Sequence, residues 1–248
     1  MIELVEDYST KCWPEIMKIL DRGVNTVIVP IGTMEAHGPH LPVATDALIP
    51  IEISRRLEEE VNAFVAPPIY YGVTTSLSCY PGSIPVSKSS FTNYLYDILV
   101  GFAKSGFINV ILINGHAGNT DSLKEAAERA YNTARVRIIN IDWWILSGEL
   151  IKKHFNVDSA GHAALAETSA ILAINEKLVK RDLYDKRQEI QKRPGIWTYP
   201  KLGSIIRGEE GDTPDFDVKR SKDFFEDVCK NVEKVVIDCL KRASENPL

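Results

Sequence analysis

The chain is poor in cysteine and has no long apolar run. Its 248 residues include 4 cysteines, none of them in a Cys-x-x-Cys pair. This scatter excludes a disulfide framework or a zinc ribbon and is typical of reduced thiols. No window approaches the ~18 consecutive apolar residues that a membrane-spanning helix needs. The N-terminal MIELVEDYSTKCW lacks the basic start and apolar run of a signal peptide. These absences predict a cytoplasmic protein with no membrane partner.

An excess of positive charge is also missing. The chain has 29 lysines and arginines against 34 aspartates and glutamates, a formal net charge of −5. A protein that binds nucleic acid usually presents a basic face, so we expect no nucleic-acid partner. The composition, 44% hydrophobic and 25% charged, is that of a globular protein with a sizeable core. We therefore expect a single domain over residues 1–248, in which the long irregular region 184–217 is a functional or intersubunit loop.

Short apolar segments alternate with helix-length amphipathic ones along the chain. The expected strands cover residues 25–31, 63–69, 108–114 and 136–142. The expected helices cover residues 10–20, 45–61, 87–105, 119–134, 163–178 and 221–242. Apolar strands joined through helices predict an α/β fold, in which parallel βαβ units build a sheet covered on both faces. Pro50 fits its helix only if it lies in the first turn.

Four of the five histidines lie in three compact polar clusters. The first cluster follows the strand 25–31 and carries Glu35 and His37, whose side chains leave an extended backbone on the same side. It ends with Asp46, at the entry of the next helix. The second cluster places His116 directly after the strand 108–114, and the third places His162 and Glu167 at the start of a helix. Sites in open parallel sheets form beyond the carboxyl ends of strands, where the first two clusters fall.

A mixture of carboxylates and imidazoles suits Zn²⁺, Mn²⁺ or Fe²⁺. A carboxylate such as Asp46 can bridge two ions roughly 3.5–4 Å apart, which together activate a water molecule for hydrolysis. Each residue alone has an ordinary explanation: a packed histidine, an aspartate that caps a helix, or a solvated Glu167. The grouping of the histidines at two strand ends and one helix start favours a metal site.

Four segments resemble the creatininase (creatinine amidohydrolase) family. They are VPIGTMEAHGPHLPVATDALIP (29–50), YPGSIPVS (80–87), INGHAGNT (113–120) and GHAALAETS (161–169). The resemblance implies a three-layer α/β/α sandwich around a mainly parallel sheet. It also implies a centre with two divalent metal ions, Zn²⁺ and/or Mn²⁺ with Fe²⁺ as an option, and a homo-oligomer, commonly a hexamer.

The resemblance also implies roles for the site residues. Glu35 and His116 would hold one ion, His37 the other, and Asp46 would bridge them. His162 would donate a proton to the leaving nitrogen or orient the tetrahedral intermediate. Creatininase has a glutamate two residues after the second-cluster histidine, where this chain has Gly118. Glu167 is the candidate replacement, as a ligand and as a catalytic group.

The implied activity is hydrolysis of a C–N bond in a small cyclic amide or amidine, with creatinine as the type substrate. Trp143, Trp144 and Ser78 are the predicted contacts with this small molecule. The same metals would serve a formylamino-pyrimidine nucleotide deformylase, in which Arg193, Lys201 or Arg207 would contact the phosphate. Peptide trimming, and a catalytically silent oligomer that keeps its metal for structure, are further alternatives.

Overall fold

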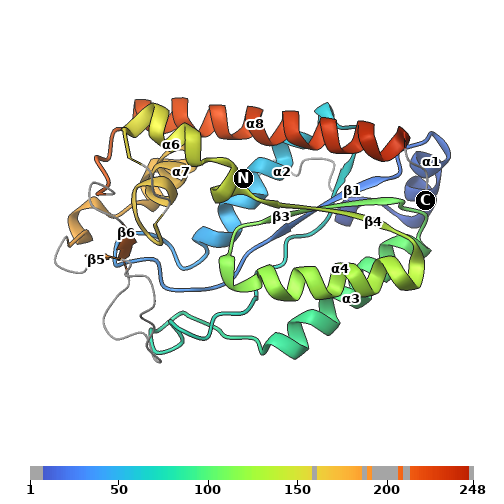
Figure 1. Cartoon of the computed structure of the whole chain (residues 1–248), viewed down its shortest axis with the longest axis horizontal. Coiled ribbons are helices and arrows are strands. Elements are labelled where there is room, and N and C mark those ends of the chain that lie inside the picture. The colour runs from blue at the N-terminus through green and yellow to red at the C-terminus, as the bar shows by residue number, and fades with distance from the viewer. Residues whose placement is uncertain (1–7, 158–160, 186–188, 192–205, 209–212, 246–248) are drawn as a thin grey trace.

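The computed structural model describes residues 8–157, 161–185, 189–191, 206–208 and 213–245. Its centre is a four-stranded sheet in the order β2-β1-β3-β4, in which every pair is parallel (Figure 1). The strands are β1 (Thr26–Ile31), β2 (Phe64–Val65), β3 (Asn109–Asn114) and β4 (Arg137–Asp142). All residues of β1 and β3 are buried, as the continuous apolar runs predict for strands covered on both faces.

Helices cover both faces of this sheet. Figure 1 shows α8, α6, α7 and α2 above it and α3 and α4 below it. The helices are α1 (Trp13–Asp21), α2 (Thr45–Glu60), α3 (Lys88–Lys104), α4 (Thr120–Ala134), α5 (Trp143–Leu146), α6 (Gly148–Phe155), α7 (Leu165–Asn175) and α8 (Val218–Glu245). Four short 3₁₀ segments accompany them, at Tyr8–Thr10, Ala117–Asn119, Glu176–Leu178 and Arg181–Leu183.

Two hydrophobic cores fill the layers between helices and sheet. Alternate strand residues enter different cores, so that Ile111 and Ile113 pack against the α2, α7 and α8 side. Val110 and Leu112 pack against the α3 and α4 side. The predicted α/β/α sandwich around a parallel sheet is thereby confirmed.

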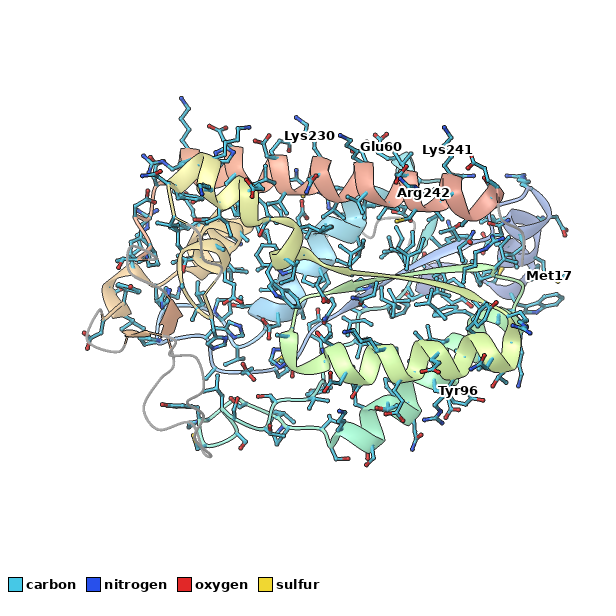
Figure 2. All side chains as sticks on the ribbon, viewed as in Figure 1. Met17, Glu60, Tyr96, Lys230, Lys241 and Arg242 are labelled. Carbon is cyan, nitrogen blue, oxygen red and sulfur yellow. The ribbon has the colours of Figure 1, made fainter. Side chains whose placement is uncertain are left out.

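The long helix α8 closes the upper layer through one apolar stripe. Phe225, Val228 and Val232 are buried on that stripe. Lys230 and Lys241 extend from the opposite face, away from the sheet (Figure 2). The helix α8 is therefore amphipathic, as the apolar stripe in its sequence indicated. In the described part of the chain, no helix is both long and apolar enough to cross a membrane.

Two expectations differ from the structure. Pro50 is the sixth residue of α2, beyond its first turn. In a regular helix the N–H of residue 50 would bond the carbonyl of Asp46, and a proline has no N–H to donate there. The region 184–217 contains a short parallel pair, β5 (Glu189–Gln191) and β6 (Ile206–Gly208), which its irregular composition did not predict. Arg193 and Lys201, and the side chain of Arg207, lie outside the described residues.

Candidate metal centre

The three polar clusters meet at one edge of the sheet. Ile31, the last residue of β1, pairs in register with Asn114, the last residue of β3. The segments that follow carry Glu35 and His37 from β1 and His116 from β3. Because the carboxyl ends of parallel strands share an edge, these side chains come together there. The first turn of α2 adds Asp46, and the entry of α7 adds His162 and Glu167.

Asp46 lies between two imidazoles. Its Oδ1 lies 2.8 Å from Nε2 of His37, and its Oδ2 lies 2.8 Å from Nδ1 of His116. The carboxylate is buried, and among the described residues Oδ2 has no partner that meets the geometry of a hydrogen bond. One carboxylate therefore faces one histidine with each oxygen, which is the arrangement that a bridging ligand requires.

The six side chains form two groups that could each hold an ion. Glu35, Asp46 and His116 make one, and the other consists of His37, His162 and Glu167. Within each group, one ligand atom per residue lies within 4.8 Å of the others. The groups touch through Asp46 and His37, and through Nδ1 of His162, which lies 3.7 Å from Oε1 of Glu35. The sequence-predicted ligands are thus brought together.

Each imidazole is held by a backbone carbonyl. Nδ1 of His37 bonds the carbonyl of Glu35 at 2.9 Å, Nε2 of His116 that of Val73 at 3.0 Å, and Nε2 of His162 that of Ala36 at 3.0 Å. A carbonyl only accepts, so each of these ring nitrogens donates, and the other nitrogen offers a lone pair in the neutral ring. Metal-binding histidines characteristically show this pattern.

Residues that the sequence reasoning missed support this cluster. The hydroxyl of Thr74 donates to Oε2 of Glu35, and nothing in the local pattern around Thr74 indicates this contact. Ser83 Oγ accepts from the backbone N–H of Ala36 at 3.0 Å. Asn119 donates to the carbonyl of Gly32 and accepts from the N–H of Val73. Ser83 and Asn119 lie in the motif segments 80–87 and 113–120, so those motifs were the available signal.

Electrostatics favour a cation in the cluster. Burial alone would lower the pKa of His37, but the carboxylates of Asp46 and Glu167 outweigh it and raise that pKa to about 10. The pKa of His116 is raised to about 9 by Asp46 against the same burial. The two histidines hold the pKa of Asp46 below its usual value despite its burial. Burial raises the pKa of Glu167 to about 7. Without a metal ion, protons on the histidines and on Glu167 compensate the charge of the buried carboxylates. Divalent cations would provide the same compensation, so the carboxylates and imidazoles of the cluster fit such ions.

The cluster is open on one side. The side chains of His37, Asp46 and Glu35 are 0%, 3% and 4% exposed, whereas those of His116, Glu167 and His162 are 13%, 14% and 19% exposed. A small molecule would therefore approach across His116, His162 and Glu167.

The residues predicted to contact the substrate lie in environments that differ from that of the six candidate ligands. Trp143 is 1% exposed and belongs to the core beneath α8, and Trp144 packs at the margin of the same core. Ser78 is exposed, and its hydroxyl donates to the carbonyl of Thr75 in a local turn. Their roles as substrate contacts stay predictions. Of the remaining histidines, His40 is buried and bonds Thr168, and His154 pairs with Asp227 at 2.8 Å.

Gly118 has no room for a side chain. A Cβ on this residue would lie 2.4 Å from Nε2 of His116 and 2.4 Å from the carbonyl of Val73. A carboxylate at position 118 would therefore push the His116 ring away from Asp46. Position 118 therefore offers no carboxylate to the cluster.

The comparisons with known proteins agree on one family. A model for creatininase (creatinine amidohydrolase) matches residues 9–235. The 3-dehydro-scyllo-inosose hydrolase of Thermotoga maritima is 26% identical, over 87% of this chain and 78% of its own length. The creatinine amidohydrolase of Pseudomonas putida is 25% identical, over 68% and 72%. The mycofactocin precursor peptide peptidase of Mycolicibacterium smegmatis is 29% identical, over 64% and 62%.

A solved structure extends this agreement to the fold. A mutant creatininase of the Zn-Zn type superposes with a TM-score of 0.81 at 20% identity, over 93% of this chain and 96% of that one. The family match covers nearly all of the chain, and the predicted family and enzyme class are confirmed. The chain belongs to the creatininase family and is a hydrolase of C–N bonds, of the metal-dependent amidohydrolase type.

Proposed function

We propose that the chain hydrolyses a C–N bond in a small cyclic amide or amidine at a centre of two divalent metal ions. The observation that carries this proposal is the placement of Asp46, whose two carboxylate oxygens each lie 2.8 Å from a different imidazole. A single carboxylate between two ligand groups is what a two-ion hydrolase needs. Mixed carboxylate and imidazole donors fit Zn²⁺, Mn²⁺ or Fe²⁺.

The side chains of the cluster have separate tasks in this proposal. Glu35, Asp46 and His116 hold one ion, and His37, Asp46 and Glu167 hold the other. When bound, the ions polarise the scissile group and lower the pKa of water. Thr74 orients Glu35 through its hydroxyl. Glu167, on the more exposed side of the cluster, is also the candidate catalytic group.

The substrate is proposed from the relatives. The Pseudomonas putida relative supports a creatinine-like ring. The peptidase relative, 29% identical, supports peptide trimming as the second candidate. The deformylase alternative depends on Arg193, Lys201 or Arg207, whose side chains the structure does not describe. A homo-oligomer, such as a hexamer, also stays a prediction.

The first test is metal removal with a substrate panel. Protein purified without chelators should contain two equivalents of divalent metal per chain and should hydrolyse at least one compound among creatinine, other cyclic amides, formylamino-pyrimidines and short peptides. Chelation should abolish hydrolysis while the circular dichroism spectrum persists, and Zn²⁺ or Mn²⁺ should restore it. Hydrolysis that survives complete metal removal would contradict the proposal. Unfolding on chelation, with no hydrolysis of the panel by the loaded protein, would favour a structural metal.

Metal uptake should release protons. In the metal-free protein the pKa values of His37 and His116 are raised to about 10 and about 9, so both rings are protonated at pH 7 to 8. Each must lose its proton to offer a lone pair. Binding of two ions should therefore release about two protons at pH 8 and about three below pH 7, where Glu167, whose pKa burial raises to about 7, is protonated as well. Each affinity should fall at least about tenfold per unit of decreasing pH. Calorimetry in buffers of different ionisation enthalpy measures the release; an affinity that is constant from pH 6.5 to 8 would contradict it.

A further inference from the structure

His40 is a buried histidine of the first cluster that has no task in the proposed function. Its Nε2 lies 3.0 Å from the hydroxyl of Thr168, and both residues are 0% exposed. Burial lowers the pKa of His40 to about 4, so the ring is neutral at pH 7. Among the described residues, its Nδ1 has no hydrogen-bond partner. A buried nitrogen without a partner destabilises the folded state, and an apolar ring would avoid this cost, so packing alone does not account for a histidine here.

We propose that His40 is a positioning residue, whose hydrogen bond to Thr168 holds Glu167 in place beside His37 at the metal centre. His40 itself touches neither ion nor substrate in this assignment. The inference rests on the proposed function for the task of Glu167, but the positioning can be measured without metal or substrate.

The hydrogen bond connects two candidate ligands from distant parts of the chain. His40 lies three residues after His37, and Thr168 directly follows Glu167. One bond between residues 128 apart in sequence therefore joins the segments that carry the two ligands. Across this junction, Nε2 of His37 and Oε2 of Glu167 lie 3.7 Å apart. A change in the bond would change this separation, because each ligand is next to one end of it.

The other contacts of this region hold Glu167 less directly. Its Oε2 accepts from the N–H of Ala163 at 2.5 Å, a contact within the entry of α7 that moves with the helix. Nε2 of His162 donates to the carbonyl of Ala36 at 3.0 Å, but the side chain of His162 is 19% exposed. The bond from His40 lies in the interior, where a hydrogen bond is electrostatically stronger than in water.

His40 is itself held by its surroundings. Its carbonyl accepts from the N–H of Lys180 at 2.9 Å, beyond the end of α7. Its ring meets the rings of Tyr184 and Phe216 nearly at right angles, with centroids 4.9 Å and 6.2 Å apart. Those two rings also pack against each other, at 5.4 Å. Because such edge-to-face contacts prefer one geometry, they restrict rotation of the imidazole and keep Nε2 directed at Thr168.

Two amide substitutions at His40 separate the hydrogen bond from the ring. In His40→Gln the amide reaches the position of Nε2 and can donate to Thr168, whereas in His40→Asn it ends near the position of Nδ1. Both variants lose the same ring contacts. In crystal structures of the metal-free proteins, the 3.7 Å separation of His37 and Glu167 should persist in His40→Gln. In His40→Asn it should lengthen by more than about 0.5 Å, the tolerance of a functional constellation.

Binding of Co²⁺ gives a second readout, by competition with a chelator and by visible absorption. His40→Asn should weaken the ion bound through Glu167 by roughly 10–100-fold, as loss of an outer hydrogen-bond partner does, and should change the spectrum. His40→Gln should bind with wild-type affinity.

Variants at the other end of the bond keep the test available if the His40 variants unfold. Thr168→Val removes only the hydroxyl and should behave as His40→Asn does, whereas Thr168→Ser keeps the hydroxyl and should bind as the wild type does. His154→Asn is the matched control for a lost ring: His154 bonds Asp227 at 2.8 Å and packs on Phe224, between α6 and α8. It should leave Co²⁺ binding unchanged.

Equal results for His40→Asn and His40→Gln would overturn the assignment, whether both match the wild type or both are altered in the same way. The hydrogen bond would then not decide where Glu167 lies. Failure of the proposed function gives a different result. A wild-type protein that binds one ion or none contradicts the two-ion centre, but the metal-free structures of the two variants still decide the role of His40.

Discussion

Replacing Asp46 by asparagine is expected to abolish binding of both metal ions and, with it, hydrolysis. The substitution keeps the size of the side chain but replaces one carboxylate oxygen by an amide nitrogen, which cannot ligate a cation. Because Oδ1 and Oδ2 lie 2.8 Å from His37 and His116 respectively, either orientation of the amide spoils one group, and the loss of negative charge weakens both. The affinity should fall by far more than the roughly 10–100-fold typical of an outer partner. Elemental analysis after dialysis measures this directly.

Asp121→Asn is the matched control for this variant. Asp46 and Asp121 each lie in the first turn of a helix, α2 and α4, where a carboxylate is stabilised by the helix dipole. Asp121 is 76% exposed and pairs with Lys88 on the surface. If Asp46 served only its helix, the two variants would behave alike. Equal metal content in both variants would therefore refute the bridging role, whereas selective loss in Asp46→Asn supports it.

The parts of the structure that were predictable are those governed by local pattern. The apolar runs NTVIVPI and INVILIN identified β1 and β3 because fully buried parallel strands need continuous apolar residues. The polar residues that follow them were placed correctly because parallel strands end at one edge. The proximity of Glu35, His37 and His116 was therefore predictable from the sequence alone.

Contacts between residues far apart in the sequence were not predictable where no local pattern orients the residues involved. The hydroxyl of Thr74 reaches Glu35, 39 residues away, from an irregular segment that no periodicity orients. The pair β5–β6 has three residues per strand, too few for an alternation to appear. Pro50 was misjudged because the expectation allowed a proline only in the first turn of α2, whereas it is the sixth residue of that helix.

Replacing Gly115 by alanine is expected to lower both stability and metal affinity. A Cβ on Gly115 would lie 1.9 Å from the carbonyl oxygen of Asp46 and 2.7 Å from Cγ of Pro50. Gly115 cannot retreat easily, since its N–H bonds the carbonyl of Ile31 at 2.8 Å. The helix α2 must then shift, at a cost of at least about 3 kcal/mol, the upper part of the usual overpacking range. Thermal unfolding should occur about 6–12 °C lower.

The loss of metal affinity has the same geometric cause. The residue that α2 would carry away is Asp46, and the neighbour of Gly115 in sequence is His116, so their 2.8 Å contact would lengthen. Gly101→Ala makes the same chemical change on α3, where nothing lies within 4 Å of the new methyl group. There it should stabilise the protein by about 0.5–1 kcal/mol and leave metal content unchanged. If Gly115→Ala matched Gly101→Ala in both measurements, the close approach of α2 to the end of β3 would not be what holds Asp46 against His116.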